Sequence, residues 1–300
     1  MPRHLLAASL LLAWALDARF GEPPDAWHPV AWLGRVLGPL GRRLCAWPAP
    51  AALLGGATAW LGLGALLAVG ASLLQGWLGR LPWWIGVTAG ALLIKPCFAW
   101  RMLRDEVAAV ERGLGESVQA GRERVARLSS RDVQALGPCE VRETAIETLA
   151  ENLNDSVIAP LLWLALAGLP GVVVYRFANT ADAMWGYRGR YEWAGKFAAR
   201  ADDLLSWLPA RLSALLLAPA PRAWPRLLRL AASTPSPNGG WPMGAMALKL
   251  GVRLRKPGVY ALNAQAPSPT SRHTARALCL AGRAAWMGML AAVLACAVGP

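Results

Sequence analysis

Long apolar runs without charged residues are the feature that most restricts how this chain can fold. Residues 51–74 contain no charged side chain, and residues 278–298 contain only Arg283. A helix needs about 20 apolar residues to cross the hydrocarbon core of a membrane, so both runs predict transmembrane helices. Charged residues make up 16% of the sequence, whereas about a quarter of an ordinary soluble domain is charged. We therefore predict an integral membrane protein.

Three further apolar segments are shorter or interrupted. Residues 81–100 carry a single lysine, and residues 204–218 contain a proline and an arginine, so the latter segment is expected to be short, tilted or kinked. Residues 5–16 are interpreted as a retained helix rather than a cleaved signal peptide. No segment shows convincing strand alternation. We predict an all-α, polytopic membrane protein with about four or five transmembrane helices, in a single helical domain covering residues 1–300.

Basic residues are concentrated in three connections between the apolar runs. Residues 17–50, 101–155 and 219–277 hold four, eight and nine Arg or Lys, whereas residues 75–80 hold one. The positive-inside rule therefore places the three long connections, which we expect to be largely helical, in the cytoplasm. This distribution accounts for the net charge of +13 without a nucleic-acid partner. Because the third connection contains no Asp or Glu, it could also bind anionic lipid head groups or phosphates.

One apolar segment, residues 156–174, is broken by Pro160 and by the turn residues 169–171. Its pieces are too short to cross a membrane, since a crossing takes about 20 residues. We therefore favour a re-entrant hairpin, which would keep the polar residues 175–203 on the same side as the acidic helix that precedes them. A full crossing, which would place them on the opposite side, is the alternative.

Four carboxylates follow one another at intervals of four residues: Glu143, Glu147, Glu151 and Asp155. On a helix this spacing puts all four on one face, where like charges repel and destabilise the helix. Cations should therefore lie against this acidic stripe. Mg²⁺ is one candidate, because it binds one or two carboxylates together with water and substrate phosphates. The alternative is an acidic face that is simply exposed to water.

A second polar cluster follows in apolar surroundings. Asn179 and Asp182 are three residues apart, as a further metal or ribose contact would require. Arg188 and Arg190 could bind phosphates through their forked donors. Asp202, the first of two adjacent aspartates, stands where the next apolar helix is expected to begin. It could favour that helix N-terminus through the helix dipole or take part in catalysis, and both interpretations stay open.

Two shorter motifs complete the candidate residues. In SPNGGWPMGAMA, residues 236–247, the pair Gly239 and Gly240 would let backbone N–H groups approach an anion closely. His28 lies between aromatic and proline residues, where a structural role is favoured over acid/base chemistry. The sequence contains no Walker A motif, no dinucleotide-binding glycine motif and no HExxH motif, so a bound nucleotide would be held in an unfamiliar frame.

Taken in order, these segments resemble the adenosylcobinamide-phosphate synthase family of cobalamin biosynthesis, the CobD/CbiB family. The resemblance covers nearly the whole chain and departs from the family pattern at small points, with Ala183 where Ser is common and Ser206 where Asn is common. Five strings carry it: HPVAWLG from His28, ETAIETLAENLNDSVIAPLLW from Glu143, NTADAMWGYRGRY from Asn179, ARADDLLSWLPARL from Ala199, and SPNGGWPMGAMA from Ser236.

The resemblance implies a multi-pass enzyme of a bacterial cytoplasmic (inner) membrane whose active site faces the cytoplasm. Its expected reaction is ATP-dependent amide formation between adenosylcobyric acid and (R)-1-aminopropan-2-yl phosphate, or a related amino-alcohol phosphate, which gives adenosylcobinamide phosphate. ATP is the expected co-substrate and Mg²⁺ the expected cofactor. Membrane lipid and other enzymes of the corrin pathway are the expected partners.

Roles for individual residues are hypotheses placed on the matching motifs. The carboxylates of the acidic stripe after its first member, together with one from the second cluster, would bind the metal. Other polar groups and glycines would contact the nucleotide, and two carboxylates would act in catalysis. The proposed metal ligands are Glu147, Glu151, Asp155 and Asp182; the nucleotide contacts are Asn179, Arg188, Arg190, Gly239 and Gly240; the catalytic residues are Glu147 and Asp202, the latter accepting the proton of the attacking ammonium.

Two other classes of protein remain alternatives. An intramembrane Mg²⁺-dependent prenyl or alcohol-phosphate transferase also places acidic motifs on helices near the cytoplasmic face, although such families use two DxxD-like clusters. A noncatalytic membrane subunit or a transporter would use buried acidic residues as an ion path. Against the second class, most charges of this chain lie in the long connections rather than in the apolar runs.

Overall fold

The computed structural model describes residues 1–129, 131–187, 189–217 and 220–298. Helices make up nearly all of its regular structure, as the sequence predicted. Contacts divide the chain into two compact units, each assembled from segments that are far apart in the sequence. The first unit comprises Met1–Ala99, Ala159–Ser206 and the end of the chain from Met289, and the second comprises Trp100–Ile158 and Trp207–Gly288. The single domain expected from the sequence stays a prediction.

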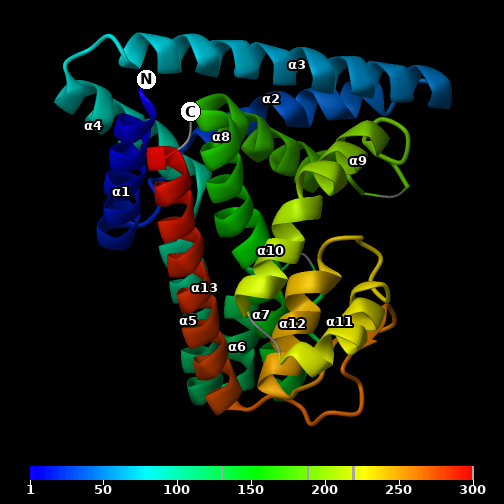
Figure 1. Cartoon of the computed structure of the whole chain (residues 1–300). Helices are drawn as coiled ribbons and strands as arrows, with labels where there is room; N and C mark the ends of the chain where they lie inside the picture. The colour runs from blue at the N-terminus through cyan, green and yellow to red at the C-terminus, as the bar shows by residue number, and fades with distance from the viewer. Residues whose placement is uncertain (130, 188, 218–219, 299–300) are drawn as a thin grey trace. The chain divides into compact units, whose positions relative to one another are not determined.

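The first unit is built from long apolar helices (Figure 1). Within it, α1 packs against α4, and α8 packs against α2, α3 and α9. The last ten residues of α13, a helix that begins in the second unit, also belong to it. Its elements are α1 (Arg3–Phe20), α2 (Pro29–Leu44), α3 (Ala49–Leu78), α4 (Trp83–Ile94), η1 (Lys95–Cys97), α8 (Ala159–Trp185) and α9 (Lys196–Leu205).

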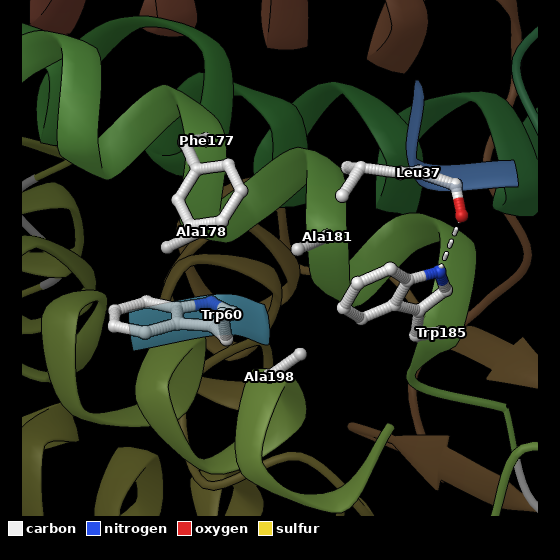
Figure 2. Close-up of a cluster of buried hydrophobic side chains, with 7 residues drawn as sticks. All are labelled: Leu37, Trp60, Phe177, Ala178, Ala181, Trp185 and Ala198. Atoms are coloured by element: carbon white, nitrogen blue, oxygen red, sulfur yellow. Dashed lines mark hydrogen bonds between the residues drawn. The ribbon is translucent and has the colours of Figure 1, made fainter. Parts of the chain in front are cut away.

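The core of the first unit combines large aromatic side chains with alanines (Figure 2). Trp60 of α3 packs against Phe177 of α8, with the rings tilted by 43° and their centroids 5.4 Å apart. Alanines of α8 and α9 complete the cluster, and small side chains of this kind let membrane helices approach closely. The indole N–H of Trp185 donates a hydrogen bond to the backbone oxygen of Leu37 at 3.0 Å, so this buried polar group is satisfied.

Helix α8 is interrupted at Gly168, whose φ of 65° and ψ of −153° are accessible to glycine and to almost no other residue. The interruption frees the N–H of Leu169, which donates to the Gln75 Oε1 of α3 at 2.6 Å. A break in the helix is tolerated at membrane depth only when such groups find partners. The discontinuity that the sequence predicted at residues 169–171 is therefore present and begins one residue earlier. The re-entrant path stays a prediction.

The second unit contains shorter helices and one small hairpin. Helix α7 packs against α5, α6, α12 and strand β1, and α12 also packs against α10 and α11. The elements are α5 (Trp100–Glu116), α6 (Val118–Val125), α7 (Pro138–Leu153), the π-helical turn η2 (Asn154–Ile158), α10 (Trp207–Leu217), η3 (Pro221–Ala223), α11 (Trp224–Ala231), α12 (Gly240–Leu250), β1 (Leu254–Lys256), β2 (Tyr260–Leu262) and α13 (Ser271–Val298).

One short β-hairpin accompanies the helices and leaves the expected all-α class unchanged. Strands β1 and β2 pair antiparallel, with Leu254 opposite Leu262 and Lys256 opposite Tyr260. Gly258 lies between them with φ of 73°, a left-handed conformation suited to the turn. Each strand has only three residues, which is too short for apolar and polar residues to show a recognisable alternation.

Among the described residues, four helical segments are long and apolar enough to cross a membrane: Ala49–Leu78, Trp83–Glu116, Pro138–Trp185 and Ser271–Val298. Three of them contain apolar runs predicted from the sequence, and the fourth contains the segment with the predicted break. The run at residues 204–218 is not among them, because the chain leaves helical geometry at Ser206 and the apolar part that follows is the 11-residue helix α10. The protein is thus a helical membrane protein.

A buried charge cluster joins three segments of the first unit. Lys95, 7% exposed, places its Nζ 3.1 Å from Asp17 Oδ1 and 2.5 Å from Glu22 Oε1. The second oxygen of Glu22 lies 2.7 Å from His28 Nε2. The other ring nitrogen of His28 accepts a hydrogen bond from the N–H of Val30 and caps α2, which supports the structural role favoured for this histidine.

The pKa of Glu22 reflects these partners. Burial opposes ionisation, but the hydrogen bonds and charges of His28 and Lys95 outweigh it and hold the pKa of Glu22 below its ordinary value. The ionised carboxylate therefore stabilises the folded state above the unfolded pKa of about 4.3, and this contribution is lost as the pH falls through the lower folded pKa.

We expect Glu22→Gln to lower the free energy of unfolding by about 2 kcal/mol at neutral pH, because Lys95 loses one of two carboxylate partners. The difference from the parent protein should shrink as the pH falls below about 4. Thermal unfolding of the detergent-solubilised protein between pH 3 and pH 7 measures both effects, with the exposed Glu116→Gln as the control. Equal stability of Glu22→Gln and the parent at neutral pH would contradict the assigned role.

Candidate functional site

The acidic stripe lies on α7 and on the turn that follows it, and arginines meet its first members. Glu143 is completely buried, and its Oε1 lies 3.2 Å from Arg253 Nη2 while its Oε2 lies 3.1 Å from Arg255 Nε. Arg255 also bonds to Glu140 at 2.9 Å. The prediction that cations lie against the stripe is confirmed here, and the cations are side chains at the start of the β1–β2 hairpin.

Glu147, one helical turn further on, is only half satisfied. Its side chain is 2% exposed, and its Oε2 accepts from Arg131 Nη2 at 3.0 Å. Arg131 also donates to Thr144 Oγ1 at 2.9 Å, which fixes the position of the guanidinium. The other oxygen, Oε1, is buried and has no hydrogen bond of ordinary geometry, although the phenol of Tyr260 interacts with the same carboxylate. Because an unpaired buried carboxylate oxygen is costly, this atom is where a bound cation or proton donor would be most strongly stabilised.

Tyr260 of β2 belongs to the same surroundings. Burial raises the pKa of its phenol, and the negative charges of Glu147 and Glu151 raise it further. The phenol therefore stays protonated at physiological pH and keeps a proton to donate. Its hydroxyl lies 3.7 Å from Met243 Sδ. The hairpin thus brings a protonated phenol to the carboxylate of Glu147.

The loop before α12 comes close to Glu151. A side-chain carbon added at Gly239 would lie 3.2 Å from Glu151 Oε1, so two residues assigned separately from the sequence are neighbours. The N–H of Gly239 already donates to Ser236 Oγ at 3.2 Å. At Gly240 a side chain would collide with the backbone of Ala231. Close packing against backbone therefore accounts for Gly240 but not for Gly239, and the contact of both glycines with an anion stays a prediction.

Asp155 lies outside the regular helix. Residues Asn154–Ile158 form a π-helical turn, a feature often found at functional sites. The carboxylate of Asp155 accepts from Asn154 Nδ2 at 2.7 Å, and Asn154 Oδ1 in turn accepts from Ser213 Oγ of α10 at 3.1 Å. The interval of four residues thus keeps one helical face as far as Glu151, while a separate buried network positions Asp155.

Within the described part of the chain, no group of three or more His, Cys, Asp and Glu side chains is arranged to hold a metal ion. The ion pairs with arginine explain this for the start of the stripe, where Glu140 and Glu143 are already neutralised. The expected ligands Glu147, Glu151 and Asp155 are not gathered into such a group in the structure, so their binding of Mg²⁺ stays a prediction. The fourth expected ligand, Asp182, lies in the first unit, so the full set stays a prediction.

The second cluster lies in the first unit, where Asn179 and Asp182 occupy adjacent turns of α8 and are partly buried. Asp203 of α9 is the aspartate whose charge reaches Asp182. Burial raises the pKa of Asp203, and Arg200, 3.9 Å away, partly opposes that rise. The sequence predicted a catalytic role for the neighbouring Asp202. In the structure, Asp203 is the residue whose charge acts on Asp182, so it is an equal candidate.

The helix-capping interpretation of Asp202 is wrong. It lies in the last turns of α9, which begins at Lys196, rather than at a helix N-terminus. The sequence predicted a helix beginning near residue 204, where the apolar run starts. The structure shows a helix that already begins at Lys196, and the polar residues in its first turns gave no apolar signal. Of the two expected phosphate-binding arginines, Arg190 is exposed, and Arg188 lies outside the described residues.

A basic pocket forms in the second unit from the connection that lacks acidic residues. It has a volume of about 820 Å³ and is lined by Arg222, Arg226, Lys249 and Arg276, with no Asp or Glu among its lining residues in the described part of the chain. These cations come from η3, α11, α12 and α13. The pocket agrees with the expectation that residues 219–277 could bind anionic head groups or phosphates.

Several residues of the site were not found from the sequence. Arg253 and Arg255 alternate as residues on one side of a strand do, so a search for cations opposite the stripe could have selected them. Arg131 and Tyr260 carry no such signal, because neither stands in a motif of recognisable spacing. Their roles depend on contacts between residues far apart in the chain.

Comparison with known proteins decides the family. The model of the family described as CobD/Cbib protein matches residues 10–290. This chain belongs to that family. The resemblance seen in the five ordered motifs is thereby confirmed, and it places the protein in cobalamin biosynthesis.

Individual relatives are similar over almost their whole length. The cobalamin biosynthesis protein CobD of Dehalococcoides mccartyi is 37% identical over 262 residues, which cover 84% of this chain and 85% of the relative. The protein of the same name from Rhodobacter capsulatus is 38% identical and covers 93% of each chain. That of Chromobacterium violaceum is 40% identical and covers 94% of each. No solved structure matches this chain.

We expect the double change Arg253→Gln and Arg255→Gln to destabilise the protein by about 3–5 kcal/mol, because it leaves the buried charge of Glu143 unpaired. Adding Glu143→Gln should recover most of this loss, since no buried charge then remains. Thermal unfolding in detergent gives both differences, with the exposed Arg229→Gln as a control for the loss of positive charge. If the triple variant is no more stable than the double variant, the ion pairs do not act as described.

Proposed function

We propose that this protein forms the amide bond between adenosylcobyric acid and (R)-1-aminopropan-2-yl phosphate, or a related amino-alcohol phosphate, in an ATP-dependent reaction that gives adenosylcobinamide phosphate. Membership of the CobD/CbiB family over residues 10–290 is the observation that carries the proposal. The buried Glu147, with one oxygen held by Arg131 and the carboxylate approached by the phenol of Tyr260, supports a site that binds a charged ligand.

The reaction needs activation of the acid. An ionised carboxylate is a poor acyl donor, so the γ-phosphoryl group of ATP would first pass to a carboxylate oxygen of adenosylcobyric acid, with ADP leaving. The amine nitrogen would then attack the carbonyl carbon as the bond to phosphate breaks, and a base would accept the amine proton. Positive charge near the transferring phosphoryl oxygens lowers the barrier of the first step.

The acidic stripe supplies the oxygen ligands that suit Mg²⁺. Glu147, Glu151 and Asp155 would hold the ion, and Asn179 and Asp182 are further candidate ligands from the sequence. When bound, Mg²⁺ neutralises negative charge on the phosphate oxygens of ATP. Arg131 orients Glu147 through Oε2 and leaves Oε1 available for the ligand.

Other residues would bind phosphate and accept the proton. Arg188 and Arg190 are the proposed phosphate contacts, since a guanidinium binds phosphate through two parallel donors. Gly239 and Gly240 would form the loop over the nucleotide, because Gly239 adjoins Glu151. Asp202 is the proposed acceptor of the ammonium proton.

We place the protein in a bacterial cytoplasmic membrane with its active site on the cytoplasmic side, where ATP is available and where its basic connections would lie. Its partners would be the two substrates, membrane lipid and other enzymes of the corrin pathway. These enzymes would supply adenosylcobyric acid and consume the product.

The direct test is turnover by the purified, detergent-solubilised protein with adenosylcobyric acid, the aminopropanol phosphate and Mg²⁺, with and without ATP. We expect an ATP-dependent product whose mass equals the sum of the two substrates minus one water, together with one ADP for each amide. Absence of this product from folded protein would refute the ligase proposal. Product formed equally well without ATP would favour a transferase reaction instead.

We expect Glu151→Ala and Asp182→Ala each to lower turnover by at least about tenfold and to raise the Mg²⁺ concentration needed for half-maximal rate, because each removes a proposed metal ligand. The exposed Glu116→Ala is the matched control. Melting temperatures of the three variants separate a loss of chemistry from a loss of folding. Unchanged turnover and Mg²⁺ dependence in folded Glu151→Ala would exclude Glu151 from the metal site.

A further inference from the structure

A groove in the first unit has apolar walls and one charge. It has a volume of about 460 Å³ and is lined by sixteen residues of the described chain, among which Arg176 alone carries a charge. Its walls come from α2, α3, α4, η1 and α8, and include Leu67, Leu92 and Val173. A space of this size lies within the range of ligand-binding pockets.

Among the described residues, no ion pair joins the charge in this groove to a carboxylate. The Nε atom of Arg176 is buried and makes no hydrogen bond within this part of the chain. The only titratable side chain beside it in the groove lining is the thiol of Cys97. Arg176 as a whole is half-buried, and an ionisable side chain set among apolar side chains of a membrane protein usually marks a binding function.

The surroundings restrict the chemistry of the missing anion. Helix α3 is one of the segments long and apolar enough to cross a membrane, and it exposes large leucines beside the groove, with Leu66 68% exposed. In a membrane such side chains contact acyl chains. A free phosphate ion would satisfy Arg176 and leave the apolar walls bare, whereas an uncharged lipid would fill the walls and leave Arg176 unpaired. An anionic phospholipid satisfies both.

We propose that this groove binds an anionic phospholipid of the surrounding membrane, with one acyl chain along the apolar walls and the head-group phosphate at Arg176. The proposal concerns the first unit alone and does not depend on the reaction proposed above. Phosphatidylglycerol and phosphatidylcholine can be prepared with the same acyl chains and differ in net charge. Comparing them therefore separates the contact of the acyl chain with the apolar walls from the contact of the head group with Arg176.

Two glycines of α3 provide a variant and a matched control that test the contact between the acyl chain and the groove walls. Gly70 lines the groove, and no atom lies within 4 Å of the position that a side-chain carbon would take there. Leucine at this position therefore fits the backbone while occupying the groove. Gly62, two turns earlier on the exposed surface of α3, is equally unobstructed and does not line the groove. Gly62→Leu controls for added bulk on the same helix.

The experiment is native mass spectrometry of delipidated protein titrated with phosphatidylglycerol or phosphatidylcholine. The parent should bind one phosphatidylglycerol about tenfold more tightly than phosphatidylcholine, as expected for a partly buried ion pair. Arg176→Gln should abolish this preference and leave the affinity for phosphatidylcholine unchanged, and Arg176→Lys should keep part of it. Gly70→Leu should weaken binding of both lipids, and Gly62→Leu should weaken neither.

Two results would overturn the proposal. An unchanged preference for phosphatidylglycerol in Arg176→Gln would show that the head group is recognised elsewhere. Equal binding of both lipids to the parent, lost in Gly70→Leu, would show that the groove takes any acyl chain and that Arg176 does not select the head group. Neither result bears on amide formation, which is measured by turnover, so the two proposals can fail independently.

Discussion

The complete burial of the Glu143 carboxylate is the constraint on which the second unit depends. A charge removed from water must be paired, and the available partners are Arg253 and Arg255. This pairing holds the β1–β2 hairpin against α7, although about 110 residues separate them in the sequence. The hairpin in turn carries Tyr260 to the neighbourhood of Glu147 and Glu151. One structural ion pair therefore positions the groups proposed for ligand binding.

The same rule of charge balance distinguishes three parts of the molecule. In the first unit, Lys95 is balanced by Asp17 and Glu22 and needs nothing more. Glu147 is paired with Arg131 at one oxygen and has no hydrogen bond of ordinary geometry at the other, and the Nε atom of Arg176 has no hydrogen bond within the described chain. We interpret the Lys95 cluster as structural. We infer that Glu147 and Arg176 each bind a ligand of opposite charge. Glu147 calls for a cation or a proton donor, and Arg176 calls for an anion.

In this membrane protein, apolar helices carry the polar side chains that the proposed reaction needs. Amide synthesis on a corrin needs cations for phosphate and carboxylates for metal and proton transfer, and the family assignment makes this chemistry the best-supported proposal. The helices that carry the acidic stripe and the aspartates of α8 and α9 are continuous with apolar segments or packed on them.

The sequence by itself determined the features that depend on neighbouring residues: the apolar helices, the face shared by Glu143, Glu147 and Glu151, the break near residue 168, and the family through its ordered motifs. Periodicity and turn chemistry are local, so they can be read without knowing where the chain goes. Only the tertiary structure decided which cations meet the stripe, where α9 begins relative to Asp202, and that Arg176 faces an apolar groove. Those outcomes depend on contacts between distant segments, and no local pattern of residues encodes them.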